Sequence, residues 1–321
     1  MSSNNNSLTS RAGVVAAFSI MVLSNFLSTA TKVLNNTDNA QISRENPTAL
    51  SPDGATFSIW GLIYLFEMLL VIYQCFPNSS ALVLGGNTRP WICASFLFNA
   101  IWLPIFSYHR WWLSFAVICA YLGALYKTNL SMGINYGDNK ISVKSQTLAM
   151  VGISLNMAWV VVATLLNFTI VARNSGIIVT TIHTGVTNTT AGAIAPSFNV
   201  ATIGGNVDWA ILCIVVASSL AIYRAWTYAD VAYCFVTAWA LGGIYRMQTY
   251  ATDANYPLAG KSTDLASWAL TFSLIVGAVG AAALGKAIYR GCTTSSAEED
   301  ASLKRSLSAN RDSAAPAGNF V

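Results

Sequence analysis

LAMVGISLNMAWVVVATLLNFTIVA, residues 148–172, runs for 25 residues without one charged side chain. A helix needs about 20 apolar residues to cross the hydrocarbon core of a bilayer. A helix on the surface of a soluble protein would instead carry charged residues along its water-facing side. This segment therefore predicts a membrane-spanning helix.

The rest of the chain has the same character. Of its 321 residues, 54% are apolar and only 9% are charged, whereas a soluble domain carries about 25% charged residues. The composition predicts an all-α protein, a polytopic membrane helical bundle. Seven further apolar runs are long enough to span, at residues 12–30, 57–76, 91–108, 111–134, 208–226, 229–246 and 264–288.

Several function classes do not fit this composition. With 17 Lys and Arg against 13 Asp and Glu, the net charge is +4, too low for a nucleic-acid partner. The two histidines, His109 and His183, flank no cysteine or carboxylate cluster, so we expect no metal site and no resident cofactor. No carboxylate pair or Ser/His/Asp set lies inside a span, so we expect no enzyme and no catalytic residue.

The distribution of basic residues predicts an orientation. Eight spans place both termini on one side, which carries eleven Lys and Arg against six on the other. By the positive-inside rule both termini are cytoplasmic, although no feature indicates which membrane holds the protein. The first run is longer than the apolar core of a signal peptide, so we expect it to stay as an anchor. The expected organisation is a polar tail (1–11), five spans (12–172), a polar loop (173–207), three spans (208–288) and a disordered polar tail (289–321).

One predicted helix carries polar and aromatic residues on a single face. Trp60, Tyr64 and Glu67 are separated by four and three residues, a spacing that aligns them along a helix. Glu67 is the one ionisable residue well inside a span, where ionisable groups are costly and often functional. It can bind a polar ligand group or a proton, or it can be a neutral acid bonded to a neighbouring helix. The sequence leaves both interpretations open.

Two other spans repeat an Asn/Trp pattern. Asn99 precedes Trp102 by three residues, and Asn156 precedes Trp159 by the same interval. Ala163 follows Trp159 at a step of four residues, on the same face. A deep tryptophan needs a partner for its indole N–H, while an asparagine inside a span commonly ties helices together. A ligand pocket and a purely structural role both fit this pattern.

Three segments together resemble the translocator protein family (TspO/MBR, tryptophan-rich sensory proteins, peripheral-type benzodiazepine receptors). They are PDGATFSIWGLIY (52–64), NAIWLPIF (99–106) and WVVVATLLN (159–167). The resemblance covers residues 12–172 and implies a five-helix TspO/MBR-like unit, here followed by about three further transmembrane helices. In that family the helices enclose a pocket for flat apolar ligands such as porphyrins and sterols. The residues expected to bind the ligand are Trp60, Tyr64, Glu67, Asn99, Trp102, Phe106, Trp159, Ala163 and Asn167.

The chain also departs from the family pattern. The loop at 31–56 has no tryptophan, and the end of the fifth span lacks the tyrosine of the sterol-contact pattern, which makes a sterol ligand less supported. In the extension, Gly277, Ala281 and Gly285 are four residues apart. Such a small-residue stripe suits close helix packing, either onto the five-helix unit or in a homodimer.

These observations predict an integral membrane receptor, sensor or carrier. Its ligand would be lipophilic and planar, a tetrapyrrole such as a porphyrin, and its other partner is membrane lipid. The alternative is an eight-helix secondary transporter of a small solute. Helices broken by Gly or Pro in both halves of the chain would support a transporter of this class. We find only Gly242-Gly243, late in the seventh span.

Overall fold

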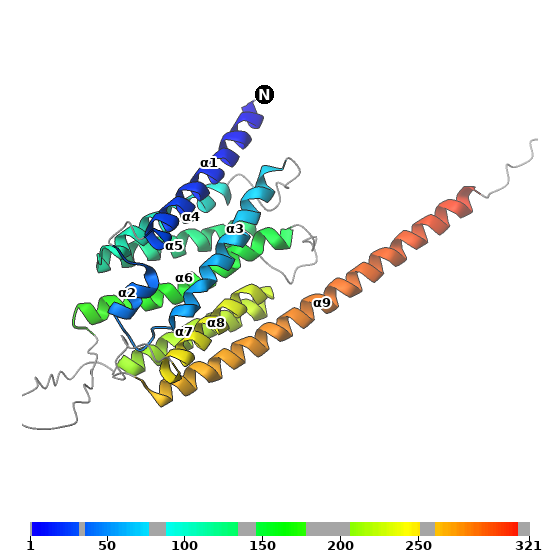
Figure 1. Cartoon of the computed structure of the whole chain (residues 1–321). Helices are drawn as coiled ribbons and strands as arrows, with labels where there is room; N and C mark the ends of the chain where they lie inside the picture. The colour runs from blue at the N-terminus through cyan, green and yellow to red at the C-terminus, as the bar shows by residue number, and fades with distance from the viewer. Residues whose placement is uncertain are drawn as a thin grey trace, which may run out of the picture.

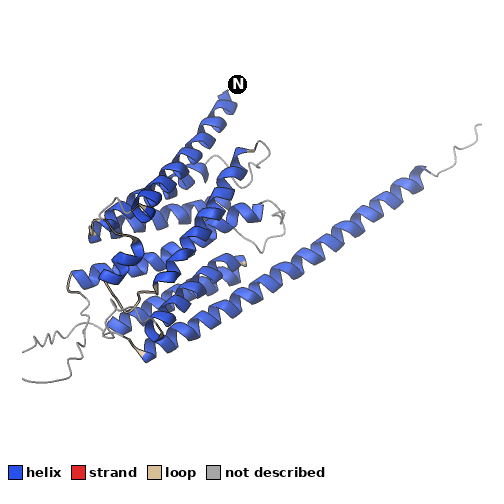
Figure 2. Ribbon diagram, viewed as in Figure 1, coloured by secondary structure: helices blue, strands red, loops and turns tan. Residues whose placement is uncertain are grey.

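A computed structural model describes residues 2–31, 36–76, 88–133, 146–177, 206–250 and 261–313. In this part of the chain every regular element is a helix and there is no strand, as the sequence predicts (Figure 2). The first five long helices pack together, and the last three lie along one side of them (Figure 1).

The five-helix unit consists of α1, α3, α4, α5 and α6. Helix α4 packs against both α1 and α5, and α6 packs against α3 and α5. A short helix, α2, and a 3-10 turn, η2, lie in the loop between α1 and α3. The bounds are α1 Ser2–Asn25 (continued by a π-helical turn, Phe26–Ala30), α2 Asn39–Glu45, η2 Gly54–Ser58, α3 Ile59–Cys75, α4 Thr88–Ser107, α5 Trp111–Met132 and α6 Gln146–Asn174.

The extension consists of α7 (Asn206–Tyr228), α8 (Val231–Thr249) and α9 (Thr263–Ser313). Helix α8 lies between α6 and α9 and contacts both, so it connects the extension to the five-helix unit. Helix α9 runs on well past its neighbours (Figure 1).

Seven helices of the described part are long and apolar enough to cross a membrane, one fewer than the sequence predicts. The expected span at 229–246 does form a helix, α8, but this helix is not among the seven. Its polar residues Thr237 and Gln248 are buried, and Gln248 Nε2 donates to the carbonyl of Ala49 (3.0 Å). A helix enclosed by protein in this way does not need an apolar surface.

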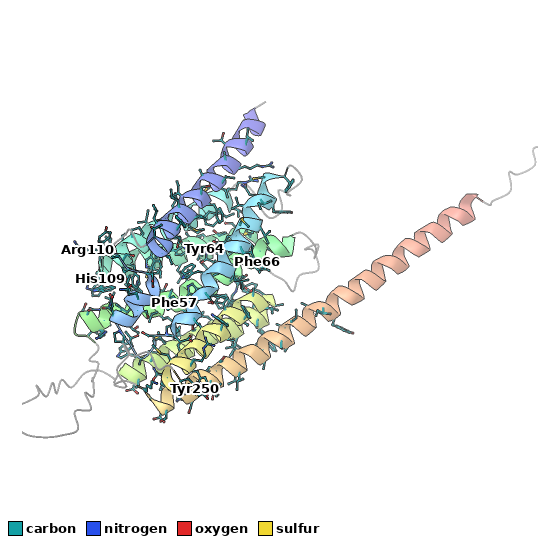
Figure 3. All side chains as sticks on the ribbon, in the orientation of Figure 1. Phe57, Tyr64, Phe66, His109, Arg110 and Tyr250 are labelled. Atoms are coloured by element: carbon teal, nitrogen blue, oxygen red, sulfur yellow. The ribbon has the colours of Figure 1, made fainter. Side chains whose placement is uncertain are left out.

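Two pairs of neighbouring helices form tight hairpins. Only Tyr108–Arg110 separate α4 from α5, and His109 takes a left-handed backbone conformation (φ +56°) in this turn, at the end of the bundle (Figure 3). Only Ala229 and Asp230 separate α7 from α8, and Ala229 is also left-handed (φ +51°).

The polar residues at the start of the chain belong to the first helix, which begins at Ser2. The predicted C-terminal tail differs from expectation. Helix α9 continues to Ser313, so the prediction of disorder from residue 289 is wrong up to that point. The charged and Ser-rich composition of this segment is shared by disordered segments and solvated helices, so composition alone does not distinguish the two. The loop predicted at 173–207 lies outside the described residues between 178 and 205.

The small-residue stripe of α9 does not attach the extension to the unit. A Cβ added at Gly277 or Gly285 would meet no atom within 4 Å. The packed face of α9 instead contains Gly280, where an added Cβ would lie 2.9 Å from Cβ of Cys234 in α8. The use of the stripe in a homodimer stays a prediction.

Candidate ligand cavity

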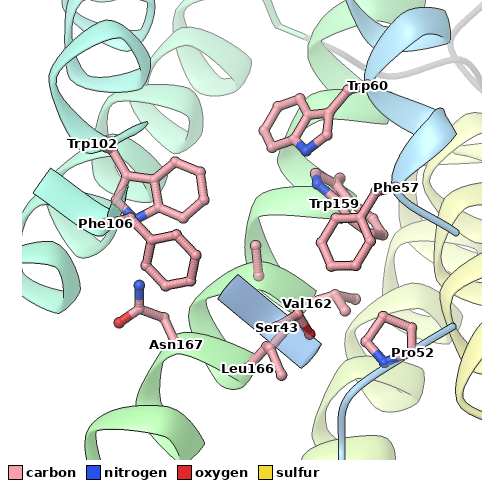
Figure 4. Close-up of a pocket in the computed structure, with 11 residues that line it drawn as sticks. Ser43, Pro52, Phe57, Trp60, Trp102, Phe106, Trp159, Val162, Leu166 and Asn167 are labelled. Atoms are coloured by element: carbon pink, nitrogen blue, oxygen red, sulfur yellow. The ribbon is translucent and has the colours of Figure 1, made fainter. Parts of the chain in front are cut away.

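A cavity with aromatic walls lies between α3, α4 and α6, closed on one side by the loop that contains α2 and η2 (Figure 4). Asp38 precedes helix α2 and caps it, because its side chain accepts a hydrogen bond from the N–H of Gln41 (2.8 Å). This short helix places Ser43 in the cavity wall. The lining residues are Ser43, Pro52, Phe57, Trp60, Trp102, Phe106, Trp159, Val162, Ala163, Leu166 and Asn167.

The aromatic rings form two groups on opposite sides of the cavity (Figure 4). On one side Trp102 stacks on Phe106, with ring centroids 5.1 Å apart. On the other side Trp159 meets the edges of Phe57 (5.8 Å) and Trp60 (6.1 Å). The closest approach across the cavity is between Trp60 and Trp102, whose centroids are 6.5 Å apart with planes tilted by 35°.

The cavity is nearly closed in this conformation. The volume of the cavity is about 20 Å³. That is room for about one water molecule. A planar ligand therefore requires the two aromatic groups to move apart.

Three polar atoms in the cavity wall are buried and have no hydrogen-bond partner within the part of the chain that the structure describes. They are the indole Nε1 of Trp102, the indole Nε1 of Trp159 and the carbonyl Oδ1 of Asn167. The amide nitrogen of Asn167 is satisfied, since it donates to Ser114 Oγ of α5 (2.7 Å). A buried polar group without a partner costs about 1–3 kcal/mol. The residues of the wall thus contain two unpaired donors and one unpaired acceptor.

The structure brings six of the nine predicted residues together in the cavity wall and places three elsewhere. Tyr64, Glu67 and Asn99 do not line the cavity. Tyr64 stacks against Trp60 from behind (5.4 Å), so it supports the wall without forming it. The six that do line it are Trp60, Trp102, Phe106, Trp159, Ala163 and Asn167.

The other three residues belong to a hydrogen-bond network that crosses all five helices of the unit. The Tyr64 hydroxyl donates to Asn25 Oδ1 of α1 (2.7 Å), and Asn25 Nδ2 donates to Asn99 Oδ1 of α4 (2.8 Å). Asn99 Nδ2 then donates to the Tyr121 hydroxyl of α5 (3.0 Å), which donates to Asn156 Oδ1 of α6 (2.8 Å). The network holds the helices in a fixed arrangement behind the cavity.

Glu67 closes the network through Asn156, whose Nδ2 donates to Glu67 Oε1. Glu67 is fully buried, and its second oxygen has no partner. Gly152 makes this contact possible, because a Cβ there would lie 2.9 Å from the backbone carbon of Phe66 in α3. Of the two interpretations of Glu67, the geometry favours the bond to a neighbouring helix.

The asparagines do not satisfy the neighbouring tryptophans. Asn99 and Asn156 both bond to Tyr121, which leaves the indole N–H groups of Trp102 and Trp159 free. Sequence reasoning missed Tyr121 and Asn25 as members of the network. The signal available for Asn25 was an asparagine inside an apolar run, as for Asn99.

Pro104 has a local role in α4. Proline has no N–H, so the carbonyl of Ala100 loses its usual partner in the helix. Ser24 Oγ of α1 donates to this carbonyl (2.7 Å) and replaces the missing bond. The proline between Trp102 and Phe106 is therefore tolerated because α1 packs against it.

The sequence matches the family of TSPO-like proteins over residues 11–203, more than half of the chain. The chain belongs to this family. The match ends before α7, so the TSPO-like unit is the part that holds the cavity and the network, and α7–α9 lie outside it. Searches of curated proteins and of solved structures gave no match.

The extension holds the loop that closes one side of the cavity of the TSPO-like unit. Asp53, next to the lining residue Pro52, forms an ion pair with Arg246 of α8 (2.9 Å), and its N–H donates to the carbonyl of Gly243 (3.1 Å). Trp239 Nε1 of α8 donates to the carbonyl of Thr56 (3.0 Å). We call these contacts the loop clamp.

The pH dependence of the loop clamp follows from Asp53. Burial raises the pKa of Asp53, but hydrogen bonds from Arg246 and Thr56 outweigh it and hold the pKa below its ordinary value of 3.8. Because the folded-state pKa is lowered, the contribution to stability is complete above the ordinary value and is lost as the pH falls below it. The pair is partly exposed, so we expect Asp53→Asn to cost about 1 kcal/mol or less at neutral pH. Thermal unfolding measured from neutral pH down to about pH 2.5 should show the two proteins converging in acid; a gap that widens in acid contradicts this assignment.

A second contact joins the extension to the TSPO-like unit at the opposite end of α8. Arg224 of α7 forms a buried ion pair with Asp230, the residue that caps α8. Arg224 Nη1 also donates to Asn129 Oδ1 of α5 (2.8 Å), and Ser154 Oγ of α6 donates to Asp230 Oδ2 (3.0 Å). The sequence did not predict that Arg224 and Asp230 are buried together.

Proposed function

We propose that this integral, multi-pass membrane protein is a receptor, sensor or carrier for a flat lipophilic ligand, a tetrapyrrole such as a porphyrin. We also propose that the protein has no catalytic role and no resident cofactor. The observation that carries the proposal is the set of free polar atoms among aromatic rings: Trp102 Nε1, Trp159 Nε1 and Asn167 Oδ1. A sterol is a weaker candidate, because it offers a single hydroxyl to these three groups.

The chemistry of the wall suits a porphyrin. Aromatic faces stack on a planar ring, and a few placed polar groups orient it. The two indole N–H groups can donate to carboxylate oxygens at the edge of the ring, and Asn167 Oδ1 can accept from a protonated group. Binding would relieve the cost of leaving these groups unpaired.

Ligand binding must open the cavity. A ring held between two aromatic planes needs a separation of about 7 Å, twice a contact distance of about 3.5 Å. Trp60 and Trp102, at 6.5 Å and tilted, are close to this separation. We propose that the ligand enters between them and widens the gap.

A tryptophan-fluorescence titration of the full chain in detergent with protoporphyrin IX tests the proposal. We expect saturable quenching. Asn167→Leu removes the free acceptor and should weaken affinity about three- to tenfold, the value of one hydrogen bond. Ser114→Ala is the matched control, since it removes the partner of the Asn167 amide nitrogen and leaves the acceptor in place.

Two results would count against the proposal. Linear, non-saturating quenching would favour the solute-transporter alternative. An equal loss of affinity in Asn167→Leu and Ser114→Ala would show that Asn167 acts only by joining α5 and α6.

We also propose that both termini are cytoplasmic. Arg224 and Arg246 are each paired with an aspartate, one at each end of the bundle. When these two paired arginines are left out of the count, the side that holds the termini still carries more Lys and Arg than the other side. By the positive-inside rule, this excess supports cytoplasmic termini.

A further inference from the structure

Arg89 is a buried cation with no counter-charge among the described residues. It lies in the first turn of α4 and is 8% exposed. Its Nε is buried without a hydrogen-bond partner, and within the described residues Arg89 forms no ion pair. Buried charges in proteins are paired or hydrogen-bonded, because an uncompensated one costs several kcal/mol.

A second arginine increases the local positive charge. Arg11 of α1 interacts with Arg89 as a like charge. One of its terminal nitrogens, Nη1, donates to the carbonyl of Cys75 at the end of α3 (3.4 Å), while its Nε is buried without a partner. Two neighbouring guanidinium groups repel each other, and an anion between them or beside them offsets this repulsion.

The two buried carboxylates of the described part are engaged elsewhere, since Asp230 pairs with Arg224 and Glu67 accepts a hydrogen bond from Asn156. The partly exposed Asp53 pairs with Arg246. The N-terminus of α4, with Arg89 in its first turn, adds further positive potential through the helix dipole. Phosphate groups commonly bind where arginines and a helix N-terminus meet.

The position of the two arginines indicates the source of the anion. The apolar span of α1 starts at Leu8, that of α3 ends at Cys75 and that of α4 starts at Thr88. Arg11 and Arg89 therefore lie where three spans meet the edge of the bilayer, at the depth of lipid headgroups. A soluble anion could reach the same place, but lipid phosphates are permanently concentrated there.

We propose that Arg11 and Arg89 form a binding site for the phosphate group of an anionic phospholipid. The guanidinium groups donate to the phosphate oxygens, and the lipid supplies the missing counter-charge to Arg89. Anionic lipids are preferred over zwitterionic ones, since a choline group beside the phosphate would place a third cation in the site.

Thermal unfolding of the full chain in nanodiscs of phosphatidylglycerol or phosphatidylcholine tests this site. We expect the wild type to unfold about 3–6 °C higher in phosphatidylglycerol. Arg89→Met should lose this gain and should unfold at a higher temperature than the wild type in phosphatidylcholine, because the uncompensated charge is gone. Arg110→Met, at the other end of α4 and exposed, is the matched control and should keep the gain.

Other results of the same experiment would contradict the proposed site or change its ligand. If Arg89→Met keeps the full gain, or is destabilised equally in both lipids, the site is overturned. If Arg89→Met does not fold, Arg11→Met must still lose part of the gain. Inorganic phosphate, added to the protein in phosphatidylcholine nanodiscs at constant ionic strength, distinguishes a lipid phosphate from a soluble one. If it raises the unfolding temperature as much as phosphatidylglycerol does, the site binds a soluble phosphate and the lipid proposal is wrong.

Discussion

Replacing Asp230 with asparagine will lower the free energy of unfolding by about 3–5 kcal/mol, because removing one partner of a buried ion pair leaves the other charge uncompensated. Arg224 is 6% exposed and Asp230 is fully buried. Asparagine preserves the size of the side chain and an oxygen that can still accept from the N–H of Tyr233 and cap α8. The substitution therefore isolates the loss of the charge.

The measurement is thermal unfolding in detergent, with Asp264→Asn as the matched control. Asp264 is exposed in the first turn of α9, so its charge is solvated and its loss should change stability by less than about 1 kcal/mol. The double variant Arg224→Met/Asp230→Asn should recover much of the loss, since neither charge is then left alone. A change below about 1 kcal/mol for Asp230→Asn would show that the pair does not hold the extension to the TSPO-like unit.

Gly243→Ala will separate α8 from the loop that closes the cavity. An added Cβ would lie 2.0 Å from Thr56 Oγ1 and 2.9 Å from Thr56 Cβ, so the two segments must move apart. Overpacking of this kind costs about 1–3 kcal/mol. The shift also weakens the bond from Trp239 to Thr56 and displaces Phe57 in the cavity wall.

The adjacent glycine provides the control for this prediction. A Cβ at Gly242 would have Ser273 Oγ as its nearest neighbour, at 3.8 Å, which is an ordinary contact. Alanine is the better helix former, so Gly242→Ala should be neutral or stabilising by up to about 1 kcal/mol. Equal unfolding temperatures for the two variants, with unchanged porphyrin affinity, would contradict the loop clamp.

The spans and the aromatic wall could be predicted from the sequence because both depend on local patterns. Charge-free runs define the helices, and steps of three and four residues place Trp159 and Ala163 on one face of α6. The family resemblance predicted which helix faces meet, and Trp60, Trp102 and Trp159 do lie around one cavity.

The polar partners could not be predicted, because they depend on how each helix rotates against its neighbours. The sequence places Asn99 one turn from Trp102, but the amide nitrogen of Asn99 donates to the Tyr121 hydroxyl of another helix. Arg224 looks like a surface charge at a span end until Asp230 is found beside it. In each case the deciding contact is between helices, and spacing along one helix carries no information about it.

The central claim is that the space between α3, α4 and α6 binds the ligand, and the most direct test fills that space. Ala163 lines the cavity, and Ala163→Phe places a ring in it. Ala282→Phe makes the same change on the exposed surface of α9. In porphyrin titrations of the three proteins we expect Ala163→Phe to lower affinity at least tenfold, while Ala282→Phe binds like the wild type. Wild-type affinity in Ala163→Phe, with saturable binding throughout, would place the ligand somewhere other than this cavity.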